Sequence, residues 1–202
     1  MKNIYILLLL ISTICYSQHE DKIEFSVKSS KLVHNKIQFF EQRQVKIEND
    51  KLKIILVKVK VKTKKYYMLK PSAISLIDKQ NKIRYRLSDY SSFYFWSFEK
   101  REFTPYRKTQ LFTERGNPIR TYPPFDKSEK DYFYDFNMKG FTNFEALVNC
   151  GTKSKPELSI LYFGRPVYEK FIARLYFPIL AKNTGIKYEL YYENEKISDI
   201  IL

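Results

Sequence analysis

The stretch LKIILVKVKVK, Leu52–Lys62, decides the fold class of this 202-residue chain. Three valines alternate with three lysines along it: Val57, Val59 and Val61 with Lys58, Lys60 and Lys62. Successive side chains of a strand point to opposite faces, so the pattern predicts a strand with one apolar face and one lysine face. Ile54 and Leu56 make the second face apolar as well, so we expect that end of the strand to be covered on both sides.

Shorter stretches with the same period of two occur on both sides of this strand. They predict about seven to nine short strands: Ile23–Val27, Val45–Ile47, Ala73–Ile77, Lys82–Leu87, Glu157–Phe163, Phe171–Phe177 and Lys187–Tyr192 are the clearest. We expect Pro178 to end the strand before it, and Asp78–Asn81 to form a turn. One-sided alternation of this kind is typical of antiparallel sheets. The predicted fold is therefore an all-β, antiparallel, immunoglobulin-like β-sandwich with at most one short helix.

The one helix that the pattern allows is Phe141–Val148. Phe141, Phe144, Leu147 and Val148 would fall on one side of a helix there. No other segment has convincing helical periodicity.

The N-terminus has the three parts of a secretion signal. Lys2 is followed by the apolar run Ile4–Ile14 and by small residues before a cut at Gln18. The run is too short to span a bilayer. We therefore expect residues 1–17 to be a signal peptide, residues 18–202 to form one domain, and the protein to be exported to the periplasm or the extracellular space. Lipid anchoring at Cys15 is the alternative, although Ile14 fits a lipoprotein cleavage motif poorly.

Charge and cysteine content limit the classes of partner that the chain can bind. The net charge of +14 would suit non-specific attraction to anionic surfaces. The lysines are scattered along the chain, and the abundance of Lys, Ile, Asn, Tyr and Phe is typical of an AT-rich coding sequence. Both observations argue against specific nucleic-acid binding. Without residues 1–17 the chain keeps one cysteine, Cys150, which cannot form an internal disulfide. We read Cys150 as a buried thiol, with a cross-link between two chains as the other possibility.

A long aromatic and basic insertion, about residues 89–140, interrupts the strand pattern. Aromatic residues crowd its start, and residues 99–130 are rich in charge and contain four prolines. This is too long for an ordinary strand connection.

The segment Leu52–Asp89 resembles immunoglobulin-like domains of unknown function found in bacterial secreted proteins and lipoproteins. The resemblance lies in the valine-rich strand, in Lys70–Asp78 (KPSAISLID) and in Arg174–Pro178 (RLYFP). Thr63–Lys65 and Asn81 depart from the family pattern in its first and second turns, and the resemblance covers about half of the chain after residue 17. It implies a sandwich, export and an interaction role, and it supplies no catalytic residues.

A search for catalytic or metal-binding patterns yields little. His19 and His34 lie in polar stretches, which makes a Ser-His-Asp or Cys-His site improbable. Four carboxylates cluster with aromatics in FDKSEKDYFYDF: Asp126, Glu129, Asp131 and Asp135. They could serve a glycosidase or a calcium site, or form a charged loop with local ion pairs, and no EF-hand spacing is present. We expect no cofactor and no metal.

Five aromatic residues form the candidate binding surface: Tyr90, Tyr94, Trp96, Tyr106 and Tyr122. Aromatic side chains bury a large area at low entropy cost, so they stack on sugar rings or anchor protein partners. Burial in the core is the competing interpretation, above all for Trp96.

Three functions follow in order. The first is an exported, non-enzymatic interaction module that works through the insertion. The second is a domain that binds carbohydrate or cell-envelope polymers through exposed aromatics. The third is a hydrolase of envelope polymers that uses the carboxylates between Asp126 and Asp135.

Overall fold

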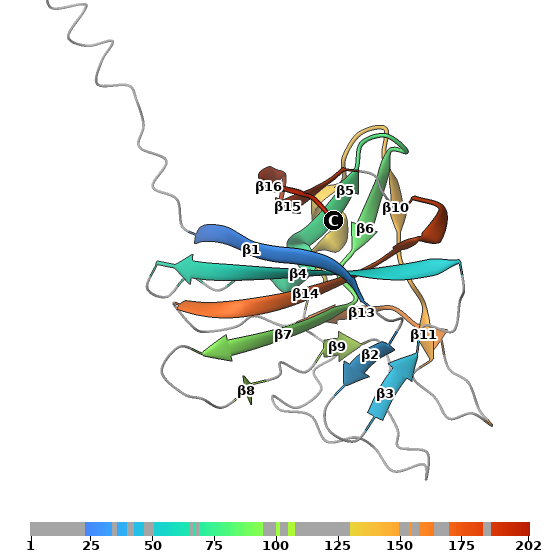
Figure 1. Cartoon of the computed structure of the whole chain (residues 1–202), viewed down its shortest axis with the longest axis horizontal. Coiled ribbons are helices and arrows are strands. Elements are labelled where there is room, and N and C mark those ends of the chain that lie inside the picture. Colours follow the sequence, from blue (N-terminus) through green and yellow to red (C-terminus); the bar gives the residue numbers. More distant parts are fainter. Residues whose placement is uncertain are drawn as a thin grey trace, which may run out of the picture.

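A computed structural model of the chain shows two five-stranded sheets packed face to face (Figure 1). The structure describes residues 23–33, 36–39, 43–46, 51–64, 67, 69–94, 100–101, 105–107, 130–149, 154, 158–163, 170–183 and 187–202. For β2, β3, β7 to β9 and β11 to β13 the description is of the backbone. The predicted all-β sandwich is confirmed.

The first sheet contains the long strands. Its order is β1 (Ile23–Val33), β4 (Leu52–Thr63), β14 (Lys170–Leu180), β7 (Asp89–Tyr94) and β8 (Lys100–Arg101). All of its described pairs are antiparallel. β4 and β14 pair along eleven positions, from Leu52 with Leu180 to Lys62 with Lys170.

The second sheet has the order β10 (Thr142–Phe144), β6 (Ile83–Arg86), β5 (Ile74–Asp78), β15 (Tyr188–Tyr192) and β16 (Glu195–Ile200). β10 pairs parallel with β6, so this sheet is mixed. Three two-stranded ribbons complete the described strands: β2 (Lys36–Phe39) with β3 (Arg43–Lys46), β9 (Pro105–Arg107) with β13 (Leu161–Phe163), and β11 (Val148–Asn149) with β12 (Leu158–Ser159). Among the described residues, three short 3-10 turns lie between strands: η1 (Pro71–Ala73), η2 (Phe133–Phe136) and η3 (Ala181–Asn183).

The strand order is that of an immunoglobulin sandwich. Strands β1, β4, β14 and β7 take the places of A, B, E and D, and β6, β5, β15 and β16 take those of C′, C, F and G. Tyr188, the first residue of β15, donates its hydroxyl hydrogen to the carbonyl of Asn183 at 2.5 Å. A tyrosine bonded back across the corner between strands E and F is a hallmark of such sandwiches.

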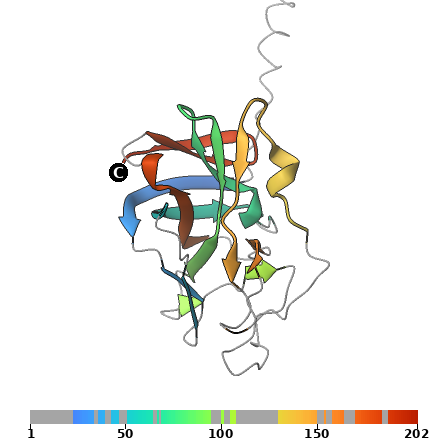
Figure 2. The ribbon, with the colours of Figure 1, turned by 90° about the vertical axis from the view of Figure 1, so that its right-hand side faces the viewer.

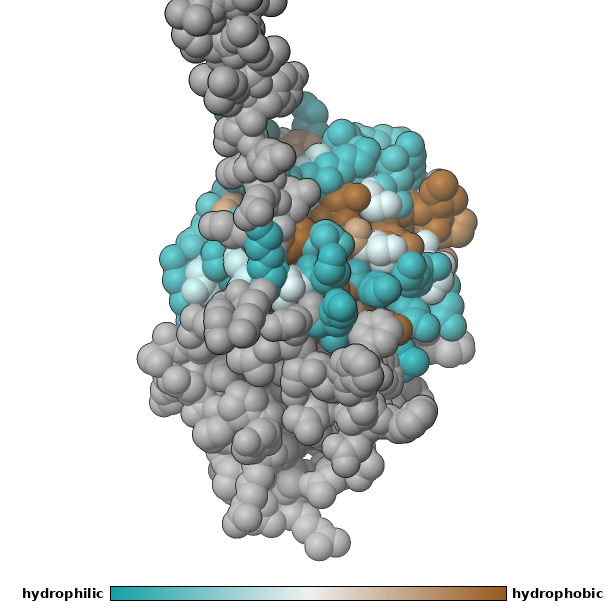
Figure 3. Space-filling model, turned by 90° about the vertical axis from the view of Figure 1, so that its left-hand side faces the viewer, coloured by the Kyte–Doolittle hydropathy of each residue, from teal (hydrophilic) through white to brown (hydrophobic). Residues whose placement is uncertain are grey.

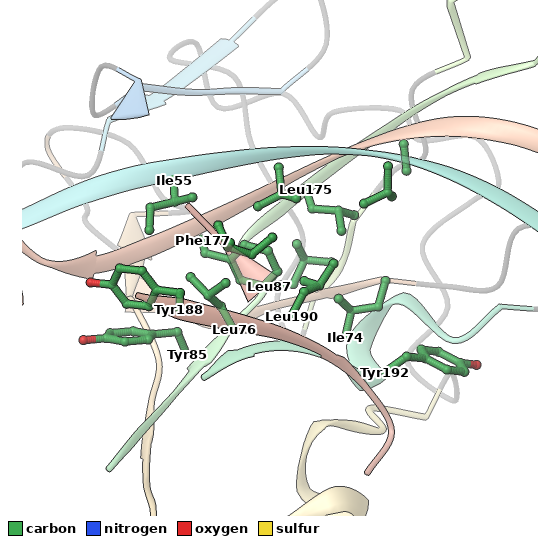
Figure 4. Packing of buried hydrophobic residues seen from close by; sticks show 14 of the residues in the cluster. Ile55, Ile74, Leu76, Tyr85, Leu87, Leu175, Phe177, Tyr188, Leu190 and Tyr192 are labelled. Carbon is green, nitrogen blue, oxygen red and sulfur yellow. The ribbon is translucent and has the colours of Figure 1, made fainter. Parts of the chain in front are cut away.

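The core lies between the two sheets and follows the predicted alternation. Val57, Val59 and Val61 are fully buried, whereas Lys60 and Lys62 are exposed. Ile54 is fully buried too, so the start of β4 is covered on both faces as predicted. From the second sheet, Tyr85 and Tyr188 contribute rings whose centroids are 6.2 Å apart (Figure 4).

A polar group is buried at one end of this core. Asp78 is fully buried and accepts hydrogen bonds from Asn81 in the β5–β6 turn and from Asn183 in η3. The Asn183 amide also donates to the hydroxyl of Tyr85 at 3.0 Å. Because these bonds join the β5–β6 turn to the β14–β15 corner, they fix the two hairpins of the second sheet relative to each other. The predicted turn at Asp78–Asn81 is confirmed.

Three local predictions were wrong. The segment Phe141–Val148 forms no helix: β10 pairs along β6, and this pairing overrides a weak helical pattern. β14 continues through Pro178 to Leu180, because β7 pairs with it only as far as Tyr176 and leaves an edge that tolerates proline. The predicted strand Glu157–Phe163 is two short strands, β12 and β13, with different partners.

Candidate functional site

The structure describes the backbone at three of the five predicted binding residues. Tyr90 and Tyr94 lie on β7, in register with Leu175 and Phe171 of β14. Tyr106 lies on β9, opposite Tyr162. Trp96 and Tyr122 lie outside the described residues, and so do His19, His34 and Cys150. The aromatic binding surface therefore stays a prediction.

Two of the four clustered carboxylates are described, and both form ion pairs. Asp131 binds Arg86, and Asp135 lies 2.6 Å from the ammonium of Lys130. These two contacts agree with the charged-loop interpretation of the cluster. Asp126 and Glu129 lie outside the described residues.

The most unusual group of side chains lies on the outer face of the second sheet. We call it the arginine cluster: Arg84, Arg86, Phe133, Asp131 and Glu145. Arg84 and Arg86 stand two positions apart on β6, so they share the face opposite Tyr85, which packs in the core. Both arginines are buried, at 0% and 2% exposure. Figure 2 shows the segment that covers them, Lys130–Asn137, in yellow beside the sheet.

Phe133 holds the two guanidinium groups together. Its ring centroid lies 3.9 Å from the guanidinium carbon of Arg84 and 4.2 Å from that of Arg86. A cation over an aromatic face is attracted to the π-electrons, more strongly when water is excluded. The ring is itself fully buried, so these contacts are shielded from water.

Arg86 is fully paired. Its Nη1 and Nη2 donate to the two oxygens of Asp131 at 2.9 and 2.7 Å, and its Nε donates to Glu145 at 2.9 Å. Glu145 also accepts a hydrogen bond from the hydroxyl of Tyr134. The two carboxylates balance the charges of Arg84 and Arg86. Asp131 attaches the covering segment to the sheet directly, and Glu145 does so through Tyr134.

Arg84 is paired through one nitrogen. Its Nη1 donates to the carbonyl of Phe133 at 2.8 Å and to Asn143 at 3.4 Å. Its Nε and Nη2 are buried and have no hydrogen-bond partner. Burial, and to a lesser degree the neighbouring charge of Arg86, lower the pKa of Arg84 to about 10, against the opposing effect of Asp131 and Glu145.

A second charged group lies on the same sheet, at β15 and β16. Glu189 contacts Lys79 and Lys196 at 2.9 and 2.7 Å. Burial alone would raise the pKa of Glu189, but hydrogen bonds from the two lysines bring it below its usual range. The lysines are more than a third exposed, so this group is a surface ion-pair network.

Exposed apolar residues gather near the edge where β1 and β16 meet. Ser30 of β1 donates to the carbonyl of Ile201 at 2.5 Å, and Leu32, Ile201 and Leu202 are exposed. Figure 3 shows apolar groups on that side, bordered by hydrophilic ones.

The part of the chain that the structure describes contains no group of three or more metal-binding side chains. Within the same residues, no helix is long and apolar enough to cross a membrane. Comparisons with protein-family models, with curated proteins and with solved structures found no match.

Sequence reasoning predicted the β6 strand but missed its buried arginines. In IRYR, Arg84 and Arg86 alternate with Ile83 and Tyr85, and a charged face of that kind usually faces water. The available signal was the acidic composition of the later segments, because Asp131 of the covering segment and Glu145 after β10 supply the matching charges.

Proposed function

We propose that this chain is an exported, non-enzymatic binding module whose recognition segment is the connection between β7 and β14. The proposal rests on the position and length of this connection. β7 and β14 are antiparallel neighbours, in the places of strands D and E, and a short turn would suffice to join them. Residues 95–169 stand between them instead.

A rigid sandwich with one very long connection is the usual arrangement of a recognition module, since binding residues are found disproportionately on loops held by a scaffold. The described part of the connection is attached to that scaffold: β10 adds a strand to the second sheet, and Asp131 binds Arg86. The first six residues of the range 89–140 form β7 and belong to the sandwich.

The composition of the connection favours a broad surface. Residues 95–129 contain eight aromatic residues, among them Trp96, the single tryptophan of the chain. Aromatic anchors suit both protein partners and sugar rings. Binding of carbohydrate or a cell-envelope polymer is therefore the second candidate. A hydrolase is third, since Asp131 and Asp135 are engaged by Arg86 and Lys130.

Export is part of the proposal. The charge, apolar run and small residues of 1–17 support it, as does the resemblance to secreted immunoglobulin-like domains. The net charge of +14 would add a non-specific, salt-sensitive attraction to anionic surfaces.

Intrinsic fluorescence of Trp96 in the purified protein tests the surface directly. An exposed Trp96 gives a red-shifted emission that acrylamide quenches readily, and a core Trp96 gives a blue-shifted emission that it quenches poorly. If the emission shows that Trp96 is exposed, the next experiment is co-sedimentation of the protein with insoluble peptidoglycan, chitin and cellulose. Binding of any of these should be lost in Trp96→Ala.

Tyr134→Ala is the matched control, because Tyr134 is an exposed aromatic outside the predicted surface. Equal loss in both variants would contradict a specific role of Trp96 in binding. A shielded Trp96 together with no bound polymer would remove the carbohydrate candidate and leave a protein partner. Release of soluble sugar during the assay would instead favour the hydrolase.

A further inference from the structure

Positive charge is concentrated on the outer face of the first sheet. Val57, Val59 and Val61 of β4 pack in the core, so the lysines that alternate with them point away from it. The strand register adds outward positions from β1 and β14, which lie on either side of β4 (Figure 1). We call the resulting group the basic face: Lys31, Lys58, Lys60, Lys62, Lys170 and Arg174.

The basic face holds more positive charge than the composition of the chain explains. Among the described outward positions of β1, β4 and β14, Glu24 is the single acid, and it pairs with Lys62 at 2.9 Å. The two side chains are 62% and 50% exposed, so solvent screens this pair. The chain has 36 basic and 22 acidic residues, so seven charged residues taken without preference would include about three acids.

Two pairs of these cations lie directly opposite each other. Lys62 of β4 is in register with Lys170 of β14, and Lys58 is in register with Arg174. Like charges in opposed positions destabilise a sheet. Lysines on an edge strand prevent pairing with other chains, but β4 and β14 are both interior strands. Neither stability nor protection of an edge explains the arrangement, and local departures of this kind are typical of functional surfaces.

The basic face is accessible to a large partner. Four of its six side chains are exposed, and the other two, Lys58 and Arg174, are partly buried. Positions two apart on a strand are separated by about 7 Å, and neighbouring strands by about 5 Å. The face therefore presents a ladder of cations, and flexible lysine side chains can follow successive negative groups of a linear polymer.

The residue types on the face narrow the class of polyanion. Five of the six cations are lysines, which act as point charges and recognise charge density rather than the planar geometry of one group. Stacking on nucleobases requires aromatic side chains, and the described outward positions of these three strands hold one, the partly buried Tyr176. Stable membrane binding combines basic with exposed apolar side chains, and no described large apolar residue that is exposed lies on β4 or β14.

We infer that the basic face binds a linear acidic polysaccharide that lies across β4 and β14. The choice of a polysaccharide over other polyanions rests on the proposed export of the protein, whereas the position of the face does not. This contact does not require Trp96, so Trp96→Ala should leave it unchanged. Loss of the binding in Trp96→Ala would instead assign it to the connection between β7 and β14, so the two proposals fail in distinguishable ways.

Titration calorimetry with polygalacturonate and with heparin tests the inference. Binding should weaken steadily as sodium chloride is raised from about 50 to about 300 mM, because salt screens exposed charges. Fully methyl-esterified polygalacturonate keeps the sugar backbone without its charges and should not bind. The triple variant Lys58→Gln, Lys60→Gln, Lys62→Gln should bind both acidic polymers roughly tenfold to a hundredfold more weakly.

The triple variant Lys82→Gln, Lys139→Gln, Lys182→Gln is the matched control. It removes the same charge from exposed lysines outside the first sheet, and its affinity should stay within about twofold. Equal loss in both triple variants would show that binding follows net charge and would overturn the face. Failure of the unmodified protein to bind either polymer would overturn it too. Tighter binding to phosphatidylglycerol vesicles or to oligothymidylate, per negative group, would overturn the choice of a polysaccharide.

A footprinting measurement on the unmodified chain covers the case in which the β4 variant does not fold. Acetic anhydride modifies accessible lysines, and mass spectrometry of peptides reports the extent at each one. Saturating polygalacturonate should protect Lys60, Lys62 and Lys170 more than Lys139 and Lys182. Equal protection of the two groups contradicts the proposal.

Discussion

At the scale of single residues, Tyr188 connects the two halves of the sandwich at the β14–β15 corner. Its ring packs in the core beside Tyr85, and its hydroxyl hydrogen-bonds the carbonyl of Asn183. Asn183 in turn bonds the buried Asp78 of the β5–β6 hairpin. One phenol therefore contributes both apolar burial and one end of a buried polar network.

Tyr188→Phe should keep the ring and leave the Asn183 carbonyl without this donor. We expect a loss of about 1–2 kcal/mol in the free energy of unfolding, measured by urea denaturation. Tyr134→Phe removes a hydroxyl that hydrogen-bonds Glu145 at an exposed position, and it should lower this free energy less. Equal effects of the two substitutions would show that the corner bond contributes nothing special.

Buried tyrosines also predict a loss of stability at high pH. Burial raises the pKa of Tyr85, Tyr188 and Tyr192 in the folded protein, whereas a free tyrosine titrates near about 10. Above that pH the unfolded chain releases phenolic protons that the folded chain retains. These three tyrosines therefore leave the free energy of unfolding unchanged below about pH 10 and lower it above that pH.

Urea denaturation between pH 8 and 11, with phenolate absorbance followed in parallel, measures this effect. Tyr188→Phe should make the decline shallower, because one of the three groups is removed. A stability that rises over this range would contradict the assignment.

At the scale of elements, Asp131 attaches the segment Lys130–Asn137 to the second sheet through the buried Arg86. Asp131→Asn leaves the nearly inaccessible guanidinium of Arg86 with one charged partner, and breaking a buried ion pair is costly. We expect a loss of roughly 2–4 kcal/mol in the free energy of unfolding. Asp135→Asn, the same change in the same segment, breaks an exposed pair with Lys130 and should have little effect. Similar losses for both variants would contradict this account.

Strand β4 allows an equally direct test. Val59→Asp places a charge at a fully buried position between the sheets, so the cooperative thermal transition should be lost. Lys60→Ala, one residue along on the exposed face, should shift the midpoint little. An unchanged melt for Val59→Asp would refute the orientation of β4.

The alternation in Leu52–Lys62 and Phe171–Phe177 predicted the sandwich because burial on one face repeats with the period of a strand. The parallel pairing of β10 could not be predicted this way, since Thr142–Phe144 is three residues long and owes its conformation to β6. The arginine cluster was missed for a similar reason. A charged residue on a strand indicates a solvated face unless another segment supplies its counter-charges, and Asp131 and Glu145 are both more than forty residues from Arg86 in sequence.

At the scale of the whole molecule, the sandwich is built from strands that are distant along the chain. β14 lies between β4 and β7, and β15 lies between β5 and β16. Each sheet thus receives an interior strand from residues 170–192 (Figure 1). Such long-range pairs define both sheets, so we expect the two sheets to unfold together as one cooperative unit. Thermal unfolding of the protein should therefore show a single transition.

The late position of these two strands has a consequence for the order of events during synthesis. A ribosome makes the chain from its N-terminus, so β1, β4, β5, β6 and β7 all emerge before either sheet can be completed. The two sheets can be completed only after residues 170–192 have been made. A secretion channel accepts an unfolded chain, so this late completion of both sheets is compatible with the export proposed above.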